Sequence, residues 1–409
     1  MTETDRYAAF RHLSYRRYFA SRFAAAFGAQ ILSVSVGFEI YKQTRDAALL
    51  GWIGLVQFLP ALLLVLLTGM AADRFGRRMV MGLSILAEML CALGILGLAI
   101  FGRFEPVFVL GILTLFGVAR AFLSPASSAL AVNLVPSEDF ANAVGWTATS
   151  WQLASVVGPA MAGLLHLASP LIAFASAAVS FAFAGGLIFS IPKPAQRTSK
   201  EPTTMKTLFG GFSYVWKEKV VLGAISLDLF AVLLGGAVAL MPVYAISVLE
   251  IGEFGNGLLR AAPGIGAIAM VVILTRFPIR NHAGIILFVS VALFGAATAV
   301  FGASTIAWVS ILALMLVGAF DMVSVLIREV LMQLWTPDEV RGRVNAVNSI
   351  FLGASNELGE ARAGFMAAKL GAVVTVVGGG VAAIGVAALW SVLFPRLRKA
   401  RHLEGREEH

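Results

Sequence analysis

The sequence predicts an all-α integral membrane protein in which twelve helices cross the bilayer as two similar groups of six. Of its 409 residues, 59% are hydrophobic and only 13% are charged, whereas a soluble domain carries about 25% charged residues. Apolar runs of the length that a membrane helix needs, roughly 20 residues, recur from one end of the chain to the other. The second half of the chain also repeats features of the first half at a constant offset.

The expected spans follow one another with short connections. They cover residues 17–43, 48–71, 79–101, 106–130, 139–167, 170–191, 219–247, 256–277, 283–302, 305–334, 340–369 and 372–395. No run alternates apolar and polar residues over about 10 positions, as the strands of a membrane barrel do. The stretch from Tyr7 to Tyr18 is too polar and too basic for the apolar core of a signal peptide, so we expect the first span to be retained.

The expected domains are two six-helix halves, residues 1–191 and 219–395. The linker between them, residues 192–218, begins with prolines, threonines and lysines that cannot bury a core. Its last part, TLFGGFSYVWKEK (207–219), alternates aromatic residues with lysines, which predicts a short helix in the cytoplasmic interface. Residues 396–409 are expected to form a cytoplasmic tail.

The net charge of +8 is a signal of topology and not of nucleic-acid binding. Most of the 31 lysines and arginines fall in loops on the side that holds both termini. The opposite side has only Lys42, Arg45, Arg103 and Lys369. Positive charge marks the cytoplasmic face, so both termini are expected to be cytoplasmic and anionic lipids to be partners. The single cysteine, Cys91, permits no internal disulfide, and it fits a bacterial inner membrane together with the tight loops.

The two halves align when they are shifted by 201 positions. The matching pairs are Gly117 and Gly318, Pro136 and Pro337, Glu138 and Glu339, Gly158 and Gly359, and Gly163 and Gly364. At the same offset Arg120 matches Asp321, so opposite charges occupy equivalent places in the two halves. Parallel repeats of this kind are typical of transporters whose binding site lies between the repeats.

The loop after the second span carries a conspicuous motif, GMAADRFGRR (69–78). Its glycines permit close helix contact and a tight turn, and its arginines hold the loop at the cytoplasmic surface. A basic loop that only obeys the positive-inside rule would look similar. The stretch nevertheless resembles motif A of the major facilitator superfamily at Gly69, Asp73, Arg74, Gly76, Arg77 and Arg78. The resemblance covers the whole chain and implies the major facilitator fold, with this loop latching the two halves during alternating access.

Two further resemblances narrow the placement of the chain within this superfamily. The fifth span, GWTATSWQLASVVGPAMAG (145–163), is similar to the antiporter motif C at Gly145, Gly158, Pro159 and Gly163. Alanines replace glycines at 154 and 162, and helix packing with a proline kink would produce a similar pattern. The stretches 226–245, 257–267 and 327–364 resemble the branch of the superfamily that contains the enterobactin (siderophore) exporter and related drug efflux proteins.

Several charged residues lie within the expected spans. Each costs roughly 2.5–3.5 kcal/mol at bilayer depth and usually faces a bundle interior or an aqueous cavity. The eleventh span places Glu357 and Glu360 on one helical face, and the tenth places Asp321 and Arg328 on another. The resulting candidates for binding a proton or substrate are Glu357, Glu360, Asp228, Asp321, Arg120, Arg328, Asn356 and Gln30. Glu88 is expected to be structural, because the third helix is peripheral in this family.

These charges allow two interpretations. They could form salt bridges without chemistry, for example Arg328 with Glu357 or Glu360. However, the acids Asp228, Asp321, Glu329, Glu357 and Glu360 outnumber the bases Arg120, Arg328 and Arg362. A carboxyl group left unpaired in a low-dielectric cavity exchanges its proton near neutral pH, as proton-coupled transport requires.

The resemblance implies a secondary active transporter that exports a small amphipathic molecule, such as a siderophore or drug, by proton antiport. Alternatives are a lysophospholipid or lipid flippase, an importer of the same fold, a sensor that has lost transport, and a membrane enzyme. No nucleophile, metal-binding or Walker A motif occurs, so no enzyme, metal or cofactor is expected. An ion gradient, with H⁺ as the expected ion, would supply the energy. The family implies a monomer.

Overall fold

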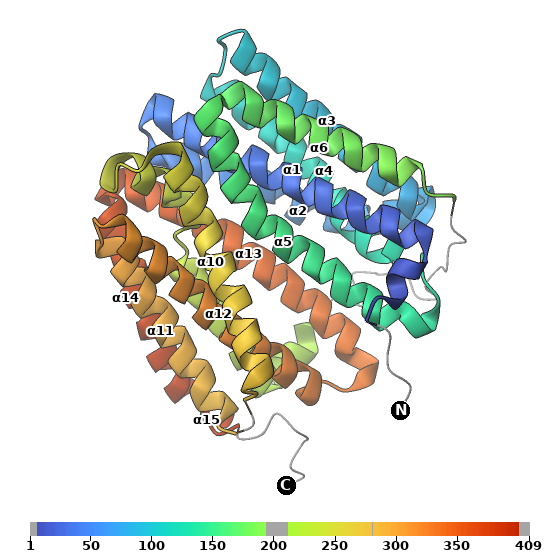
Figure 1. Cartoon of the computed structure of the whole chain (residues 1–409). Coiled ribbons are helices and arrows are strands. Elements are labelled where there is room, and N and C mark those ends of the chain that lie inside the picture. Colours follow the sequence, from blue (N-terminus) through green and yellow to red (C-terminus); the bar gives the residue numbers. More distant parts are fainter. Residues whose placement is uncertain (1–5, 132, 194–211, 280, 401–409) are drawn as a thin grey trace. The chain divides into compact units, whose positions relative to one another are not determined.

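The structure, a computed structural model, describes residues 6–131, 133–193, 212–279 and 281–400 (Figure 1). Helices make up nearly all of these residues, and no β-strand occurs among them. Eleven of the described helices are long and apolar enough to cross a membrane. The predicted all-α membrane fold is therefore confirmed.

With the exception of α8, which ends well before its expected span does, the long helices begin and end within about four residues of the expected spans. Those of the first half are α1 (Leu13–Thr44), α2 (Ala47–Phe75), α3 (Arg77–Ile100), α4 (Pro106–Ala131), α5 (Phe140–Ala168) and α6 (Pro170–Phe189). Those of the second half are α8 (Lys219–Gly235), α10 (Gly252–Arg276), α11 (Ala283–Ala303), α12 (Ala307–Trp335), α13 (Asp338–Leu370) and α14 (Ala372–Leu393). With 33 residues α13 is also long enough to cross a bilayer. It is less apolar than the other eleven because it carries Glu357, Glu360 and Arg362.

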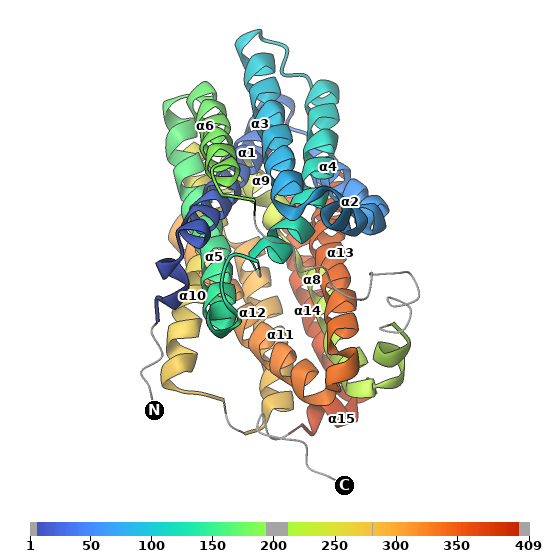
Figure 2. The same ribbon diagram turned by 90° about the vertical axis from the view of Figure 1, so that its right-hand side faces the viewer.

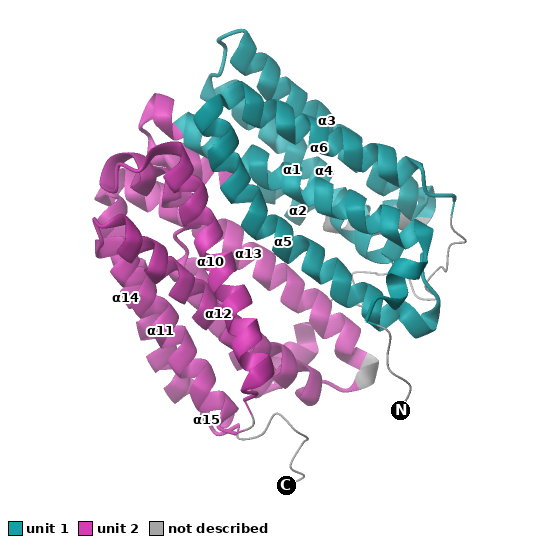
Figure 3. Ribbon diagram, viewed as in Figure 1, with its two compact units in different colours: residues 1–40, 56–203 teal, residues 41–55, 204–409 magenta. Residues whose placement is uncertain are grey.

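The chain packs as two compact units (Figure 3). Unit 1 contains residues 1–40 and 56–203, and unit 2 contains residues 41–55 and 204–409. Most of each unit comes from one half of the sequence. The exception is the segment 41–55, which comprises the end of α1 and the beginning of α2 and packs with the second half.

Two predicted segments lie largely outside the described residues. Within the linker 192–218, residues 212–217 are helical, and Val215 on this helix is buried against Val221 and Val344. The tail expected at 396–409 is described only as far as residue 400, and it begins within the short helix α15 (Pro395–Arg398).

Unit 1 is held together by close helix contacts and by buried tyrosine hydroxyls. The helix α3 packs against both α4 and α6 (Figure 2). The Tyr15 hydroxyl of α1 donates to the Ala143 carbonyl of α5 at 2.7 Å, and the Tyr18 hydroxyl donates to the Ser127 carbonyl of α4 at 3.0 Å. Both tyrosines are fully buried, so these bonds fix the rotation of α1 against its neighbours.

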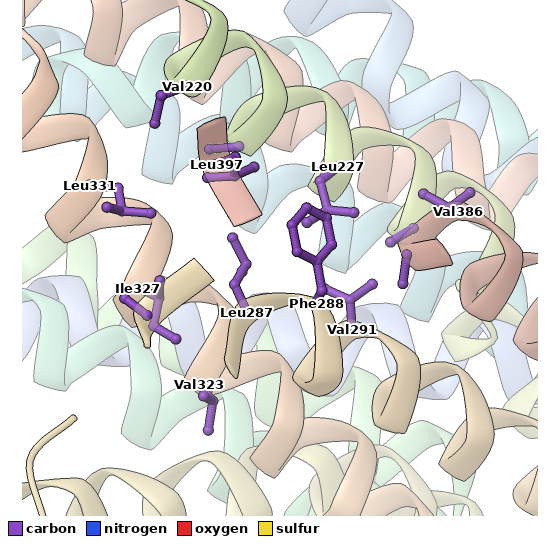
Figure 4. Close-up of a cluster of buried hydrophobic side chains, with 14 residues drawn as sticks. Val220, Leu227, Leu287, Phe288, Val291, Val323, Ile327, Leu331, Val386 and Leu397 are labelled. Carbon is purple, nitrogen blue, oxygen red and sulfur yellow. The ribbon is translucent and has the colours of Figure 1, made fainter. Parts of the chain in front are cut away.

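The apolar core of unit 2 is centred on α11 (Figure 4). Leu287, Phe288 and Val291 of this helix belong to one buried cluster with Leu227 of α8 and Ile327 of α12. The cluster also includes residues of α14 and α15. The helices α8, α12 and α14 therefore have apolar anchors on one common side, and their polar residues face elsewhere.

Glycines of the sequence repeat make equivalent contacts in the two units. In unit 1 Gly117 of α4 lies against the backbone of Gln57 in α2, and in unit 2 Gly318 of α12 lies against the backbone of Pro263 in α10. A β-carbon at either glycine would collide with that backbone. Gly158 of α5 likewise lies against α1, as its repeat partner Gly359 of α13 lies against α8. The constant offset in the sequence therefore corresponds to a repeated packing geometry.

The span expected at 219–247 is not one continuous helix, which corrects that prediction. The helix α8 ends at Gly235, and a 3₁₀ turn (Val238–Leu240), the short helix α9 (Met241–Val243) and a π-helical turn (Tyr244–Val248) complete the crossing. A helix that ends within a membrane leaves backbone carbonyls without partners. Arg362 of α13 compensates, because its Nη2 donates to the Leu234 carbonyl at 2.6 Å.

The segment 41–55 contacts α13 and the π-helical turn within unit 2. The Gly51 backbone touches Gly364, and the Trp52 ring packs edge-on against Phe365 at 5.3 Å between centroids. At the end of α1, the Tyr41 hydroxyl lies 3.0 Å from the Ser247 hydroxyl. Small residues at the helix contact allow the two backbones to approach closely, as is usual for helices in membranes.

The glycine contacts predict a local effect of side-chain volume on stability. We expect Gly318→Ala to lower the Tm by roughly 3–10 °C, because the added methyl group meets the Pro263 backbone, which cannot move aside cheaply. The matched control is Gly378→Ala in α14, where nothing lies within 4 Å of the new β-carbon. Thermal unfolding of the purified protein in detergent would measure both, and equal Tm values would contradict the packing argument.

The broken span predicts that Arg362 stabilises the protein mainly through its bond to the Leu234 carbonyl, since its other bond, to the Met366 sulfur, is weak. Arg362→Met keeps much of the side-chain volume but removes the donor to Leu234, and we expect a loss of about 1.5–3 kcal/mol. Arg343→Met, at an exposed position on the same helix, is the control and should be close to neutral. The free energy of unfolding of both variants, measured by chemical denaturation in mixed micelles, checks this expectation. A neutral Arg362→Met would exclude a capping role.

Candidate functional site

A buried ion pair joins α8 and α12 in unit 2. Arg328 Nη2 lies 2.7 Å from Asp228 Oδ1, and the two side chains are only 4% and 7% exposed. Ser324, one turn before Arg328, accepts a hydrogen bond from its Nε at 3.2 Å. Glu357 and Glu360, named as examples of salt-bridge partners for Arg328, are not its partners; Arg328 does form a salt bridge, but with Asp228. Its partner lies on α8 because the rotation of α12 turns Arg328 toward that helix.

Asp321 lies near this ion pair. It is two turns before Arg328 on α12, and it is close enough to Asp228 and Arg328 to experience both charges. It forms no hydrogen bond or ion pair with any described residue. Asp228, Asp321 and Arg328, which we call the α8–α12 cluster, therefore combine two acids with one arginine. Of the predicted candidates, the structure brings these three together.

A second charged group in unit 2 joins α10, α13 and the beginning of α2. Arg260 of α10 is within electrostatic range of both Glu357 and Glu360 of α13. Gly54 of α2 faces the same two acids, since a β-carbon at this position would lie 3.6 Å from Glu360 Cβ and 3.8 Å from Glu357 Oε2. Arg260, Glu357 and Glu360, which we call the α10–α13 cluster, again combine two acids with one arginine.

Three other residues considered from the sequence lie outside both charged clusters. Asn356 is exposed, and its amide donates to the Leu352 carbonyl of its own helix at 2.8 Å. Glu329 is exposed as well, so it does not add to the buried acids. The Gln30 side chain packs against Gly158, at the contact between α1 and α5. None of these positions joins either charged cluster.

Arg120 lines a cavity within unit 1. The cavity has a volume of about 340 Å³ and is surrounded by α1, α3, α4 and α5. Arg22 of α1 and Glu88 of α3 line it as well. Glu88, which was expected to be structural, thus borders open space beside two arginines. Arg22 was not among the predicted candidates, although its spacing to Ala25, Ala26 and Ala29 on one face of α1 was an available signal.

Equivalent helix contacts carry opposite charges in the two units. Since α1 begins at residue 13 and α8 at residue 219, Arg22 corresponds to Asp228 at an offset of 206. Ser127 corresponds to Arg328 at the offset of 201. Arg22 Nη1 donates to the Ser127 hydroxyl at 2.6 Å, in the place where unit 2 has its ion pair. The contact is repeated, but the cation lies on the other helix.

The motif A arginines bind helix ends within unit 1. Arg77 Nη1 donates to the Ala129 carbonyl in the last turn of α4 at 3.0 Å, and Arg78 Nη2 donates to the Phe189 carbonyl at the end of α6 at 2.8 Å. These bonds satisfy carbonyls that a helix end leaves free. Gly76 has a φ of 88° and forms the turn between α2 and α3. Of the remaining motif residues, Arg74 is exposed, and the burial of Gly69 and Asp73 is not among the described features.

The motif C residues lie on α5, which is helical from Phe140 to Ala168 despite its internal Pro159. Gly158, Pro159 and Gly163 are buried, and Gly158 is the residue that contacts α1. Gly145 is exposed, with nothing within 4 Å of a β-carbon added there. Three of the four positions thus serve helix packing inside the protein.

Metal chemistry has no candidate site in the described ranges. No group of three histidine, cysteine, aspartate or glutamate residues there is arranged to hold an ion. The only buried histidine, among the residues whose burial is described, is His166; its Nε2 lies 3.1 Å from Glu39 Oε2, so it is engaged with a carboxylate. The polar chemistry of the spans is therefore that of arginines and carboxylates.

Comparisons with known proteins agree with this architecture. A family model described as a transmembrane secretion effector matches residues 4–407. The enterobactin exporter of Citrobacter koseri is 26% identical over 405 residues, which cover 95% of this chain and 94% of that protein. Macrolide efflux protein A of Streptococcus pyogenes is 27% identical over 233 residues, which cover 56% of each chain.

Solved structures show the same fold. A D-xylose–proton symporter superposes with a TM-score of 0.71 at 15% identity, and the match covers 95% of this chain and 99% of that chain. A transporter of the POT family superposes with a TM-score of 0.73 at 13% identity, covering 94% and 96%. The match of the family model over nearly the whole chain shows that this protein belongs to the transmembrane secretion effector family of the major facilitator superfamily, and is thus a membrane transporter and not an enzyme.

Proposed function

We propose that the protein exports a small amphipathic molecule, siderophore-like or drug-like, by alternating access in exchange for protons. In this proposal it is a monomer in the inner membrane of a bacterium, with both termini in the cytoplasm. The lysines and arginines that gather on one side of the predicted topology support this orientation.

The direction of transport is supported by relatives of this chain. One is named for enterobactin export and matches along nearly its whole length, and another is named for macrolide efflux. The resemblance of α5 to the antiporter motif points the same way. Alanines at 154 and 162, where that motif has glycines, are the departure from the pattern.

The observation that carries the proposal of proton coupling is the α8–α12 cluster. A coupled transporter needs a carboxyl group that alternates between a charged and a neutral state inside the membrane. Here Arg328 neutralises one carboxylate through the ion pair with Asp228, and Asp321 has no partner of its own among the described residues. One bound proton would cancel the excess negative charge. Its release would restore the competition of two carboxylates for one arginine, which is a bistable arrangement.

We expect the exported compound to be retained in cells when this cluster is neutralised. A deletion strain of the native host, starved of iron, should accumulate siderophore inside and lose it from the medium, and the wild-type gene should restore secretion. Asp321→Asn should restore less than about a tenth of it, since a residue that exchanges protons in the membrane contributes at least ten-fold to transport. Mass spectrometry of cells and spent medium measures the ratio.

The matched control is Glu329→Gln, an exposed acid on the same helix, which should restore secretion fully. Erythromycin susceptibility of the same strains tests the drug-like alternative. If deletion changes neither siderophore secretion nor erythromycin susceptibility, both exported classes are excluded, and a lipid flippase or an importer becomes the better interpretation. If Asp321→Asn secretes normally, coupling through this cluster is excluded.

The ion pair predicts that variants of Asp228 and Arg328 affect thermal stability and transport differently. Asp228→Asn and Arg328→Gln should each lower the Tm by roughly 5–10 °C, because each leaves an unpaired buried charge. The double variant removes both charges and should regain most of the lost Tm, yet it should remain defective in secretion. A double variant that secretes like the wild type would show that the pair is only structural. A double variant as unstable as the single variants would contradict the pairing.

A further inference from the structure

The cavity of unit 1 has a composition that neither charged cluster of unit 2 shares. Its polar lining residues are Arg22, Glu88, Arg120, Ser124 and Ser127, with Trp151 as an aromatic wall, and alanines, Met81 and Leu123 complete it. Its volume of about 340 Å³ lies at the lower end of the range of small-molecule sites. An apolar wall with a few convergent polar groups is the usual composition of such sites.

Glu88 gives the cavity an unsatisfied carboxyl group. The residue is 1% exposed, and neither of its carboxyl oxygens accepts a hydrogen bond from a described residue. Arg120 of α4 is the nearby opposite charge, but it attracts Glu88 without a direct bond. A buried polar group without a partner is costly, and both oxygens are shielded from solvent, so Glu88 influences the cavity through its charge and not by direct contact with a ligand.

The two arginines retain hydrogen-bond donors for a ligand. Arg22 uses Nη1 on the Ser127 hydroxyl, while its Nε is buried without a partner. Arg120 forms no hydrogen bond or ion pair with a described residue, and its guanidinium carbon lies 6.0 Å from the centre of the Phe116 ring. A guanidinium carries five N–H donors in a planar fork that fits a carboxylate or another planar oxyanion.

We propose that this cavity is a binding site for the anionic group of an aromatic, amphipathic molecule. A carboxylate-like oxyanion would contact Arg22 and Arg120, and its aromatic body would lie against Trp151 and the apolar wall. When Glu88 is ionised it offsets the charge of one of the two arginines, which leaves a net positive charge of one to attract the anion and allows the anion to be released again. This inference rests on the proposed transport function, because it names the class of molecule transported.

Phospholipid phosphate offers a similar oxyanion, but the cavity favours a soluble molecule. Its volume suits a small aromatic acid and leaves no room for two acyl chains in addition to the headgroup. Aromatic contact is also available at Trp151, which has no counterpart in a lipid headgroup. The test therefore includes a lipid competitor.

Binding of three matched probes to the purified full-length chain in detergent tests the site by calorimetry. The probes are 2-naphthoate, the neutral 2-naphthamide and the cationic 2-naphthylmethylammonium, which share one ring system. The wild type should bind naphthoate at least about ten-fold more tightly than the other two. Arg22→Gln and Arg120→Gln should each weaken naphthoate binding by roughly ten-fold to a hundred-fold and leave naphthamide binding unchanged. At alkaline pH, where the buried carboxyl group is ionised, Glu88→Gln should strengthen naphthoate binding, because it removes the repelling carboxylate.

The arginine variants should weaken naphthoate binding and the glutamate variant should strengthen it. A folding defect would weaken binding in all of them, so this pattern excludes a folding defect as the common cause. Arg103→Gln, an exposed loop arginine of the same unit, is the control and should bind like the wild type. Equal binding of naphthoate and naphthamide by the wild type, or naphthoate binding unaffected by both arginine variants, would overturn the proposal. Displacement of naphthoate by equimolar phosphatidylglycerol but not phosphatidylcholine would assign the site to a lipid and also overturn it.

This outcome is independent of the secretion test. If the binding pattern holds and the deletion strain secretes normally, the site exists and the proposed export is wrong. If secretion depends on the gene and the arginine variants bind normally, export stands and this assignment fails.

Discussion

The hydrocarbon of a bilayer offers no hydrogen bond, so each charged side chain within these spans needs a partner in the protein or water in a cavity. The chain meets this constraint in three ways that differ in consequence. Arg362 donates to a backbone carbonyl at a helix end, and that bond is fixed for as long as the helix ends there. Arg328 binds a carboxylate that a proton can neutralise. Arg120 borders open space together with Glu88, in the cavity that we propose binds a ligand. Only the last two arrangements can change during transport.

Because of the sequence repeat, charged residues occupy equivalent positions in the two units. The sign of the charge at these positions differs between the units. The contact between the first and fourth helices of unit 1 recurs in unit 2, with Arg22 in place of Asp228. Two turns earlier on the fourth helix, Arg120 stands in place of Asp321. As a result the unit 1 cavity has two arginines and one acid, and the α8–α12 cluster has two acids and one arginine. The two similar units therefore differ in charge: the unit 1 cavity suits an anion, whereas the α8–α12 cluster of unit 2 suits a proton or a cation.

Sequence reasoning could predict the helices, the repeat and the glycine contacts, because these depend on properties of one helix at a time. Apolar length fixes where a span begins and ends, and a repeated glycine marks a close contact wherever its partner lies. The partner of Arg328 could not be predicted, since the pairing depends on how α8 and α12 are rotated toward each other. Glu88 was assigned from the number of its helix in the family and not from the face on which it lies. The break after Gly235 was missed because the apolar run continues through it.

The segment SNELGEARAG (355–364) illustrates why charges that are adjacent in sequence need separate explanations. Arg362 donates to a carbonyl at the end of α8, whereas Glu357 and Glu360 lie within electrostatic range of Arg260 of α10. The small size of Gly54 lets α2 approach these acids, so the chain places a segment of its first half beside charges of its second half. The α10–α13 cluster then has two carboxylates for one arginine, the same ratio as the α8–α12 cluster. The α8–α12 cluster needs one proton for neutrality, and an anion bound in unit 1 would need none. Substrate and proton would therefore be held by different units, and the coupling between them would have to act through movement of the helices and not through direct competition for one site.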